Sequence, residues 1–472
     1  MRFVYFLLFL TAALQGFSQS ESVSMSISRN DAKTTYRTSD PFNSFNIETR
    51  GTIEVSDDDR DISSMSHDGY FEVTKTSFGS KRTIKIIREG SVLIKRYYEG
   101  RTEVNFDPAG RKWLAEILPE VVRTTTIAAE SRVNRFYAKG GTPAVLAEIE
   151  AIRSDHVKSY YARLLMKKPV AEKDYSLVVT KVTGNMSSDH YITEFLENNL
   201  DKFLKNKEAT EAVFAATNEM GSDHYKTQII KEALRAQPPS VESVKIALAS
   251  AAEINSDHYK TEVLTSLMRQ GNLTDDIVAE MINTSKTIQS DHYRSVVLTK
   301  ALERDLSPSA HQRAVESVKD IHSDHYKTQV IKSLLNKSID EKVLAELLPV
   351  TSTIGSDHYR SEVLTMLLDR QDFSDATFEQ LVEYSAEIES DHYKSEILRN
   401  ALDRSDLNDT KIIALLTAAK TINSDHYLTE VLVSATSRVR TGNEALKNAY
   451  RDAARKIDSE TYYGRAMRAL DR

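Results

Sequence analysis

The 472-residue sequence contains no cysteine, and this absence excludes several kinds of chemistry. The chain can form no disulfide, no thiolate metal site, no cysteine nucleophile and no lipidated cysteine at a cleavage site. It also lacks a His-Glu-x-x-His zinc motif, a Gly-x-Ser-x-Gly nucleophile elbow and a Gly-Lys-Ser/Thr phosphate loop. We therefore expect no enzyme activity, no catalytic residue, no metal and no cofactor.

Long apolar runs are missing except near the N-terminus. Arg2 precedes an almost unbroken apolar stretch from Phe3 to Leu14, and Gly16-Phe17-Ser18 places small residues where a signal peptidase inspects them. The stretch is shorter than the roughly twenty residues that a spanning helix needs. We expect residues 1–18 to be a signal peptide and Gln19 the new N-terminus. The protein would then be periplasmic or secreted, with no membrane span after cleavage.

Charge of one sign does not dominate the chain. Hydrophobic residues make up 40% and charged residues 28%, which is typical of a globular protein, and the net charge is −7. This mildly acidic balance gives no general attraction to nucleic acid, so we expect no nucleic-acid partner.

Residues 19–107 predict a small antiparallel β-domain. Short alternating runs are separated by turns that contain glycine, as in β-hairpins. The runs are 45–49, 52–55, 70–76, 82–87, 91–97 and 102–106. The acidic segment Asp57-Asp58-Asp59-Arg60-Asp61 could contact calcium, but it lacks the alternating ligands and the glycine of a calcium loop. We favour a solvated hairpin turn.

Helical spacing begins after Pro108. Apolar pairs at Trp113-Leu114, Ile117-Leu118 and Val121-Val122 predict a helix that Pro119 kinks or divides. We expect residues 108–150 to connect the β-domain to the repeats and cap them, and Trp113 to be a packing residue.

A Ser-Asp-His turn recurs nine times at intervals of 33 or 34 residues, which predicts tandem repeats. Its serines are Ser154, Ser188, Ser222, Ser256, Ser290, Ser323, Ser356, Ser390 and Ser424. Its aspartates are Asp155, Asp189, Asp223, Asp257, Asp291, Asp324, Asp357, Asp391 and Asp425. Its histidines are His156, His190, His224, His258, His292, His325, His358, His392 and His426. Ser459 begins a degenerate last copy, and Ile or Met stands two residues before each serine.

Each repeat predicts two short helices. In the repeat at Ser256, the serine can be an N-cap, and Asp257 suits the positive end of the helix dipole. Tyr259, Val263, Leu264, Leu267 and Met268 form an apolar stripe. Gly271-Asn272 ends this helix, and Thr274 begins a second helix with its own stripe. Similar second start signals are Ser307-Pro308, Ser374-Asp375 and Asn408-Asp409.

The predicted fold is mainly α. It is a right-handed α-solenoid of about ten helix-pair repeats, preceded by the β-domain. We place the solenoid at residues 151–442 and a capping segment at residues 443–472.

The repeated turn allows a chemical and a structural interpretation. Five histidines have a glutamate one helical turn later, as if to share a metal: His190/Glu194, His258/Glu262, His358/Glu362, His392/Glu396 and His426/Glu430. The same slot holds Gln228, Gln329 and Val296, and a position that accepts valine is a poor ligand position. We therefore favour a structural turn in which serine caps, histidine contacts the backbone or a neighbouring repeat, and tyrosine packs inside.

A basic column follows the histidines. It comprises Lys158, Lys226, Lys260, Arg294, Lys327, Arg360 and Lys394, with Ile192 and Leu428 as exceptions. It could be a binding ridge for anions or polymers, formed above all by the six residues from Lys226 to Lys394. We favour a solvated stripe paired with the aspartates three residues earlier.

These turns resemble those of uncharacterised exported bacterial proteins with Ser-Asp-His/Tyr-Tyr-Lys helical repeats, over about residues 45–460. The segments Gly69-Tyr70-Phe71-Glu72-Val73 and Trp113-Leu114-Ala115 share in the resemblance. Similar repeat regions accompany membrane metallopeptidases of the β-lactam-sensor type. Because the zinc motif and membrane helices of those enzymes are missing here, the resemblance implies the fold and no peptidase activity.

A long repeat array without catalytic signatures favours a binding or scaffold protein of the cell envelope, with a protein or peptide partner. Its specificity would lie at the positions that vary around the turn. The alternative is a metal-binding or pH-responsive protein that uses the Asp-His column. An unrecognised hydrolase at the junction of the β-domain with the repeats has the least support.

Overall fold

The computed structural model describes residues 23–27, 33–39, 42–235, 241–269 and 273–471. The expected signal peptide, residues 1–18, lies outside this description, and so does the helix end expected at Gly271-Asn272. Within the described ranges, no helix has the length and apolar character needed to cross a membrane. The chain divides into two compact units: unit 1, Met1–Phe195, and unit 2, Leu196–Arg472.

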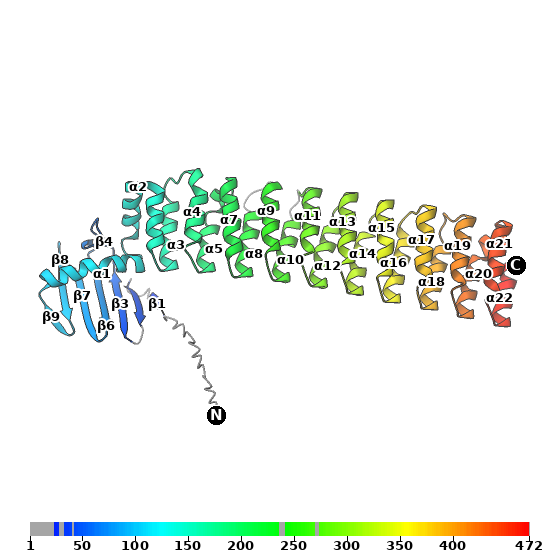
Figure 1. Cartoon of the computed structure of the whole chain (residues 1–472), viewed down its shortest axis with the longest axis horizontal. Coiled ribbons are helices and arrows are strands. Elements are labelled where there is room, and N and C mark those ends of the chain that lie inside the picture. The colour runs from blue at the N-terminus through cyan, green and yellow to red at the C-terminus, as the bar shows by residue number, and fades with distance from the viewer. Residues whose placement is uncertain (1–22, 28–32, 40–41, 236–240, 270–272, 472) are drawn as a thin grey trace, which may run out of the picture. The chain divides into compact units, whose positions relative to one another are not determined.

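The chain is mainly helical, with helix-pair repeats after an N-terminal antiparallel sheet, which confirms the predicted α-solenoid and β-domain (Figure 1). Seven strands form one sheet in the order β1-β2-β3-β6-β7-β8-β9, and β4 and β5 form a separate hairpin. The strands are β1 Val23–Ile27, β2 Lys33–Ser39, β3 Asn43–Arg50, β4 Ile53–Val55, β5 Ile62–Met65, β6 Tyr70–Ser77, β7 Ser80–Glu89, β8 Val92–Glu99 and β9 Thr102–Val104.

Three of these strands were not predicted, namely β1, β2 and β5. Their sequences, VSMSI, KTTYRTS and ISSM, are rich in serine and threonine. Strand pairing places them: β2 pairs with β3 over its whole length, β1 pairs with β2, and β5 pairs with β4. Strand β5 also buries Ile62 and Met65. Hydrophobic alternation alone cannot reveal strands of this kind.

One face of the sheet is the core of unit 1. Ile47, Val73, Ile84 and Tyr97 stand opposite one another on four neighbouring strands, and each is at most 1% exposed. The β4–β5 hairpin and α1 (Arg111–Thr124) complete this core. Helix α1 passes through Pro119 without a break, and Trp113 packs against Tyr97 with ring centroids 5.8 Å apart, as a packing residue should.

The connecting segment contains two further helical elements. A short element, η1 (Phe106–Gly110), leads into α1, and its Asp107 has an extended backbone with φ −97° and ψ 133°. Helix α2 (Ala129–Ala151) is two helices joined across a kink at Gly140 and Gly141, where Gly141 has φ +62°. Pro143 follows the kink, close to the start of the second segment, where proline is well tolerated.

Each repeat consists of a first helix, which begins at the residue after the turn serine, and a second helix. The first helices are α3 Asp155–Met166, α5 Asp189–Glu197, α8 Asp223–Arg235, α10 Asp257–Met268, α12 Asp291–Leu302, α14 Asp324–Leu334, α16 Asp357–Arg370, α18 Asp391–Leu402, α20 Asp425–Thr441 and α22 Glu460–Asp471. The second helices are α4 Tyr175–Thr183, α7 Lys207–Glu219, α9 Val241–Ala252, α11 Asp275–Ser285, α13 Pro308–Lys319, α15 Glu341–Ser352, α17 Asp375–Ala386, α19 Asp409–Ala419 and α21 Glu444–Ala454. Two short elements, η2 Glu172–Asp174 and α6 Leu200–Phe203, lie between them.

In unit 2, each first helix packs on the first helix of the next repeat, and each second helix packs on the next second helix (Figure 1). The buried residues include the isoleucines that precede the turns, such as Ile254, Ile288 and Ile321, each at most 1% exposed. Neither helix of a repeat could bury its apolar stripe alone, so stacking makes the core continuous.

In unit 1, a buried ion-pair network joins the β4–β5 turn to α2 and α3. Arg132 is 1% exposed and donates to Asp59 Oδ2 at 2.8 Å and to Glu148 Oε1 at 2.7 Å. It also donates to the hydroxyl of Tyr161 on α3. Arg135 donates to Asp59 Oδ1 at 2.5 Å. The expected solvated turn is therefore wrong for Asp59, although it fits the neighbouring Asp57, whose side chain is 94% exposed.

This environment shifts two pKa values. Burial opposes ionisation of Asp59, but the hydrogen bonds from Arg132 and Arg135 outweigh burial and lower the pKa of that carboxyl. Burial raises the pKa of Tyr161 to about 12, so this phenol stays neutral. The network holds the β4–β5 hairpin against α2 and α3.

We expect Asp59→Asn to lower the free energy of unfolding of unit 1 by about 3 kcal/mol at pH 7, because it leaves two guanidinium groups facing a neutral amide. Since folding lowers the pKa of Asp59, its stabilisation is complete above the unfolded pKa of about 3.9 and is lost as the pH falls through the lower folded pKa. Denaturation followed by Trp113 fluorescence should show the difference from wild type shrink below about pH 4.

Asp57→Asn is the matched control, because Asp57 is the exposed neighbour in the same turn. It should change stability by less than about 0.5 kcal/mol. Equal effects of the two substitutions on stability at pH 7 would contradict a stabilising role for the buried ion-pair network.

Candidate functional site: the Ser-Asp-His turns and the His-Tyr ladder

In eight of the nine turns, the aspartate joins its repeat to the next one. Asp257 Oδ2 accepts from the backbone N–H of Ser290 at 2.7 Å and from that of Gln289 at 3.1 Å. Equivalent bonds, with their lengths to the next turn serine, are Asp155–Ser188 2.8 Å, Asp223–Ser256 2.7 Å, Asp291–Ser323 2.7 Å, Asp324–Ser356 2.9 Å, Asp357–Ser390 2.7 Å, Asp391–Ser424 2.8 Å and Asp425–Ser459 2.8 Å. We call this contact the Asp joint.

The Asp joint differs from the roles predicted for the turn. Ser256 has the extended backbone of an N-cap, with φ −75° and ψ 119°, but its hydroxyl makes no capping bond. The backbone N–H groups at this helix start need an acceptor, and the carboxylate of the preceding repeat supplies it. The bond is charge-assisted, and it places a negative charge at the positive end of the next helix dipole.

Several second helices use their own side-chain caps, as predicted, but the cap predicted at Thr274 is wrong, because its hydroxyl makes no capping bond. Ser307 accepts from Ala310 N at 3.3 Å, Ser374 from Thr377 N at 3.2 Å and Asn408 from Lys411 N at 2.9 Å. The two kinds of helix start are therefore satisfied differently, one within a repeat and one across repeats.

The basic column is buried, so it is neither an exposed ridge nor a solvated stripe. Six of its members are 4–8% exposed: Lys158, Lys226, Lys260, Arg294, Lys327 and Lys394. Lys260 Nζ donates to Thr287 O at 3.2 Å, Arg294 to Asp320 O at 2.9 Å, and Lys394 Nζ to Thr421 O at 3.2 Å. Each acceptor lies just after a second helix, where carbonyl groups lack helical partners.

Three further members make similar contacts at the ends of second helices. Lys158 donates to Asn185 O, Lys327 to Thr353 Oγ1 at 2.8 Å, and Arg360 to Ser352 O at 2.5 Å. Burial lowers the pKa of Lys260 and of Lys327. The sequence does contain one sign that the column is buried, namely its two exceptions, Ile192 and Leu428. A position that accepts both lysine and aliphatic residues suits a side chain whose aliphatic stem is buried.

The histidines and tyrosines of the turns form a row of rings along unit 2. Each histidine lies 5.1–5.3 Å from the tyrosine that follows it and 5.4–5.9 Å from the tyrosine of the next repeat, between ring centroids. Seven histidines, from His224 to His426, thus alternate with eight tyrosines. The tyrosines are Tyr225, Tyr259, Tyr293, Tyr326, Tyr359, Tyr393, Tyr427 and Tyr462. We call this row the His-Tyr ladder.

The ladder faces solvent. All seven histidines are exposed, and the tyrosines are half-buried rather than inside the core. The hydroxyl of Tyr359 lies 3.4 Å from His325 Nδ1, and that of Tyr393 lies 3.4 Å from His358 Nδ1. The expected contact of histidine with a neighbouring repeat is therefore a ring contact with the next tyrosine.

The glutamates one turn after the histidines have other partners. Glu262 binds Lys231, Glu362 binds Lys332, and Glu430 binds Arg465 at 2.7 Å. Across the described part of the chain, no three His, Asp or Glu side chains form a group that could hold a metal ion. In these three repeats, a basic side chain therefore holds the glutamate.

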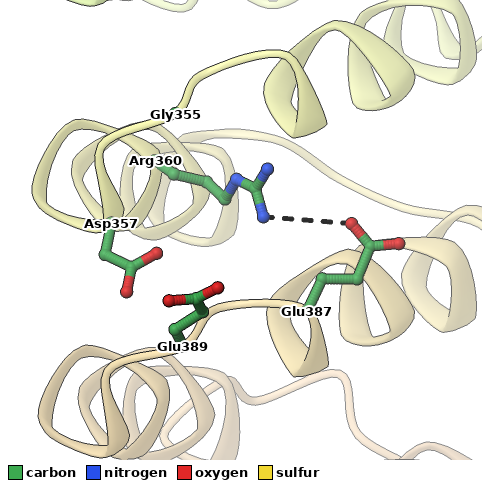
Figure 2. A pocket seen from close by; sticks show the side chains of 5 residues that line it. All are labelled: Gly355, Asp357, Arg360, Glu387 and Glu389. Atoms are coloured by element: carbon green, nitrogen blue, oxygen red, sulfur yellow. Dashed lines mark ion pairs between the residues drawn. The ribbon is translucent and has the colours of Figure 1, made fainter.

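An open hollow lies between the repeats that begin at Ser356 and Ser390, lined by Gly355, Asp357, Arg360, Glu387 and Glu389 (Figure 2). Arg360 lies 3.9 Å from Glu387, and Asp357 accepts from Ser390 N. Arg360 and Asp357 already belong to the basic column and the Asp joint. The hollow is thus a local widening of the joint, with no arrangement that suggests catalysis.

Comparisons with known proteins give no family. No family model matches the chain, and no curated protein matches it. One similar solved structure is a circular tandem repeat protein with novel repeat topology; it is 13% identical with a TM-score of 0.15, and the match covers 77% of this chain and 78% of that one. Another comes from the computational design of self-assembling cyclic homooligomers, at 10% identity and a TM-score of 0.12, covering 67% and 98%. Likenesses this weak support no argument about function.

Removing one Asp joint should destabilise unit 2. We expect Asp257→Ala to cost about 2 kcal/mol, because the N–H groups of Gln289 and Ser290 lose a charged acceptor. Chemical denaturation measures the loss, and hydrogen exchange should become faster at these two amides. Gln289→Ala keeps the backbone N–H and is the matched control, with a change below about 0.5 kcal/mol. Unchanged exchange in Asp257→Ala would refute the joint.

Proposed function

We propose that the chain is a non-enzymatic binding or scaffold protein of the cell envelope, and that its repeats bind a protein or peptide partner. The His-Tyr ladder carries this proposal. Its rings are not needed to fill the core, because Ile, Leu and Val side chains do so. Exposed or half-exposed aromatic rings with polar edges are typical of binding surfaces.

The ladder supplies contacts at a constant interval, and the residues beside it vary. The slot one turn after each histidine holds Gln228, Glu262, Val296, Gln329, Glu362, Glu396 and Glu430. All are exposed or half-buried. A regular row of rings beside a variable column suits an extended peptide, with the rings giving affinity and the variable slots giving specificity.

The envelope location is part of the proposal. Its support is the signal-like sequence of residues 1–18, together with the resemblance of the turns to exported repeat proteins. Fractionation of cells that produce the full chain tests it, since a cytoplasmic, unprocessed protein would exclude this location.

We expect a photo-reactive amino acid at Tyr293 to crosslink the partner in envelope extracts. The same label at Lys319, exposed on second helix α13, is the control and should give little product. A triple variant, with His258→Ala, His292→Ala and His325→Ala, should keep its helical circular dichroism. It should reduce crosslinking of the partner by the Tyr293 label at least about tenfold, because it removes three exposed imidazole rings. Equal crosslinking from both labels would count against the ladder.

A pH-responsive role is the second candidate, and the tyrosine hydroxyls beside His325 and His358 favour it. Protonation would make both ring nitrogens of such a histidine donors, and this would change its contact with the tyrosine hydroxyl. Repeating the Tyr293 crosslinking at pH 5.5 and 7.5 distinguishes pH-responsive binding from pH-independent binding. Equal capture at both values would leave simple binding and exclude the pH response.

A further inference from the structure

Two phenylalanine rings project from one end of the sheet in unit 1. Phe78, in the β6–β7 turn, is 80% exposed, and Phe42, just before β3, is 64% exposed. Their rings stack with centroids 5.7 Å apart and planes 22° apart. The backbone N–H of Phe78 donates to Phe42 O at 2.9 Å, so the two rings are held together as one feature. We call this pair the aromatic tip.

The backbone under Phe78 does not favour phenylalanine. β6 ends at Ser77 and β7 begins at Ser80, so Phe78 and Gly79 form a two-residue turn with φ values of +47° and +82°. Two positive φ values mark a type I′ turn, which strongly prefers Asn-Gly. A bulky residue in this conformation is strained, and such strain clusters at functional positions. The turn would form more easily without the ring, so the ring has another use.

Positive charge surrounds the aromatic tip. Lys81 pairs with Thr76 and Arg82 with Lys75, within the last three residue pairs before the turn. Neighbouring residues on a strand point to opposite faces, so Lys81 and Arg82 flank the tip from both sides of the sheet. Both are exposed.

The β8–β9 turn reaches the same end of the sheet and adds Arg101, since Gly100 N donates to Lys81 O at 2.8 Å. Arg101 is exposed as well. Among the described residues at this end, the opposing carboxylates are Glu99, which faces Arg82 across the strands, Glu103, further from the tip, and Glu120 of α1, which pairs with Lys75 at 2.8 Å. The balance is positive although the whole chain is acidic.

We propose that the aromatic tip binds the surface of an anionic lipid bilayer. The rings enter the region below the headgroups, and Lys81, Arg82 and Arg101 contact lipid phosphates. A projecting pair of rings with cations around it needs no complementary pocket, which favours a fluid lipid surface over a folded partner. The site lies in unit 1 and is independent of what the His-Tyr ladder binds.

The test is vesicle sedimentation with the protein as the cell produces it. One set of vesicles contains equal parts of phosphatidylglycerol and phosphatidylethanolamine, and the other contains only phosphatidylcholine. Wild type should partition more strongly onto the anionic vesicles, and added salt should weaken this binding. Phe78→Asn should reduce the partition coefficient at least about tenfold, because it removes the more exposed of the two rings.

Phe78→Asn also separates function from structure. Because asparagine suits the type I′ turn, this variant should unfold at the same or a higher temperature than wild type. Val92→Thr is the control: Val92 is 58% exposed in the β7–β8 hairpin, at the opposite end of the sheet, and its loss should leave binding unchanged. Arg101→Glu should weaken binding to anionic vesicles only.

Three outcomes would overturn the proposal. They are failure of wild type to bind either kind of vesicle, undiminished binding by Phe78→Asn, and equal losses in Phe78→Asn and Val92→Thr. The Tyr293 crosslinking experiment tests the His-Tyr ladder and does not depend on the aromatic tip. A negative result with vesicles is therefore distinguishable from failure of the proposed function.

Discussion

The repeats depend on one contact, the hydrogen bond from a backbone N–H to the aspartate carboxylate of the preceding repeat. Apolar stacking gives the repeats most of their burial, but it is not directional. The Asp joint fixes where each helix begins relative to the one before it, because one carboxylate must reach the N–H groups at a single position. At Asp257 it reaches two of them within about 3 Å.

The Asp joint also tolerates variation in repeat length. The turn at Ser323 follows that at Ser290 by 33 residues, whereas the turn at Ser290 follows Ser256 by 34. The bond to the next serine is nevertheless 2.7 Å in both cases. The connecting loops absorb the missing residue while the helix start keeps its place. The His-Tyr ladder benefits directly, since its ring spacing continues without interruption through these repeats.

The sequence predicts the periodic part of this structure well. Helix pairs follow from apolar stripes, and the caps at Ser307, Ser374 and Asn408 follow from local rules that involve residues three apart. The Asp joint could not be predicted in this way, because its partners are 31 to 34 residues away and an aspartate at a helix start already has a local explanation. Lys260 was misplaced for a similar reason: a cation is expected outside, and only the carbonyl groups after the second helix explain its burial.

Unit 1 shows the other limit of such prediction. Strand β2 is held by its neighbour rather than by an apolar face, and Asp59 lies in an acidic run that suggests a solvated loop. Its guanidinium partner, Arg132, is 73 residues away, so the pair becomes visible only once the fold brings them together.

Because every Asp joint connects one repeat only to the next, the joints of unit 2 act in series. A pulling force applied along the stack would load all of them equally, and the weakest joint would open first while its neighbours stayed closed. At a fixed end-to-end distance, opening one joint lengthens the chain locally and lowers the force on the others. A stack built in this way can give way one repeat at a time and close again in the same manner, and its mechanical strength is set by its weakest joint rather than by their sum.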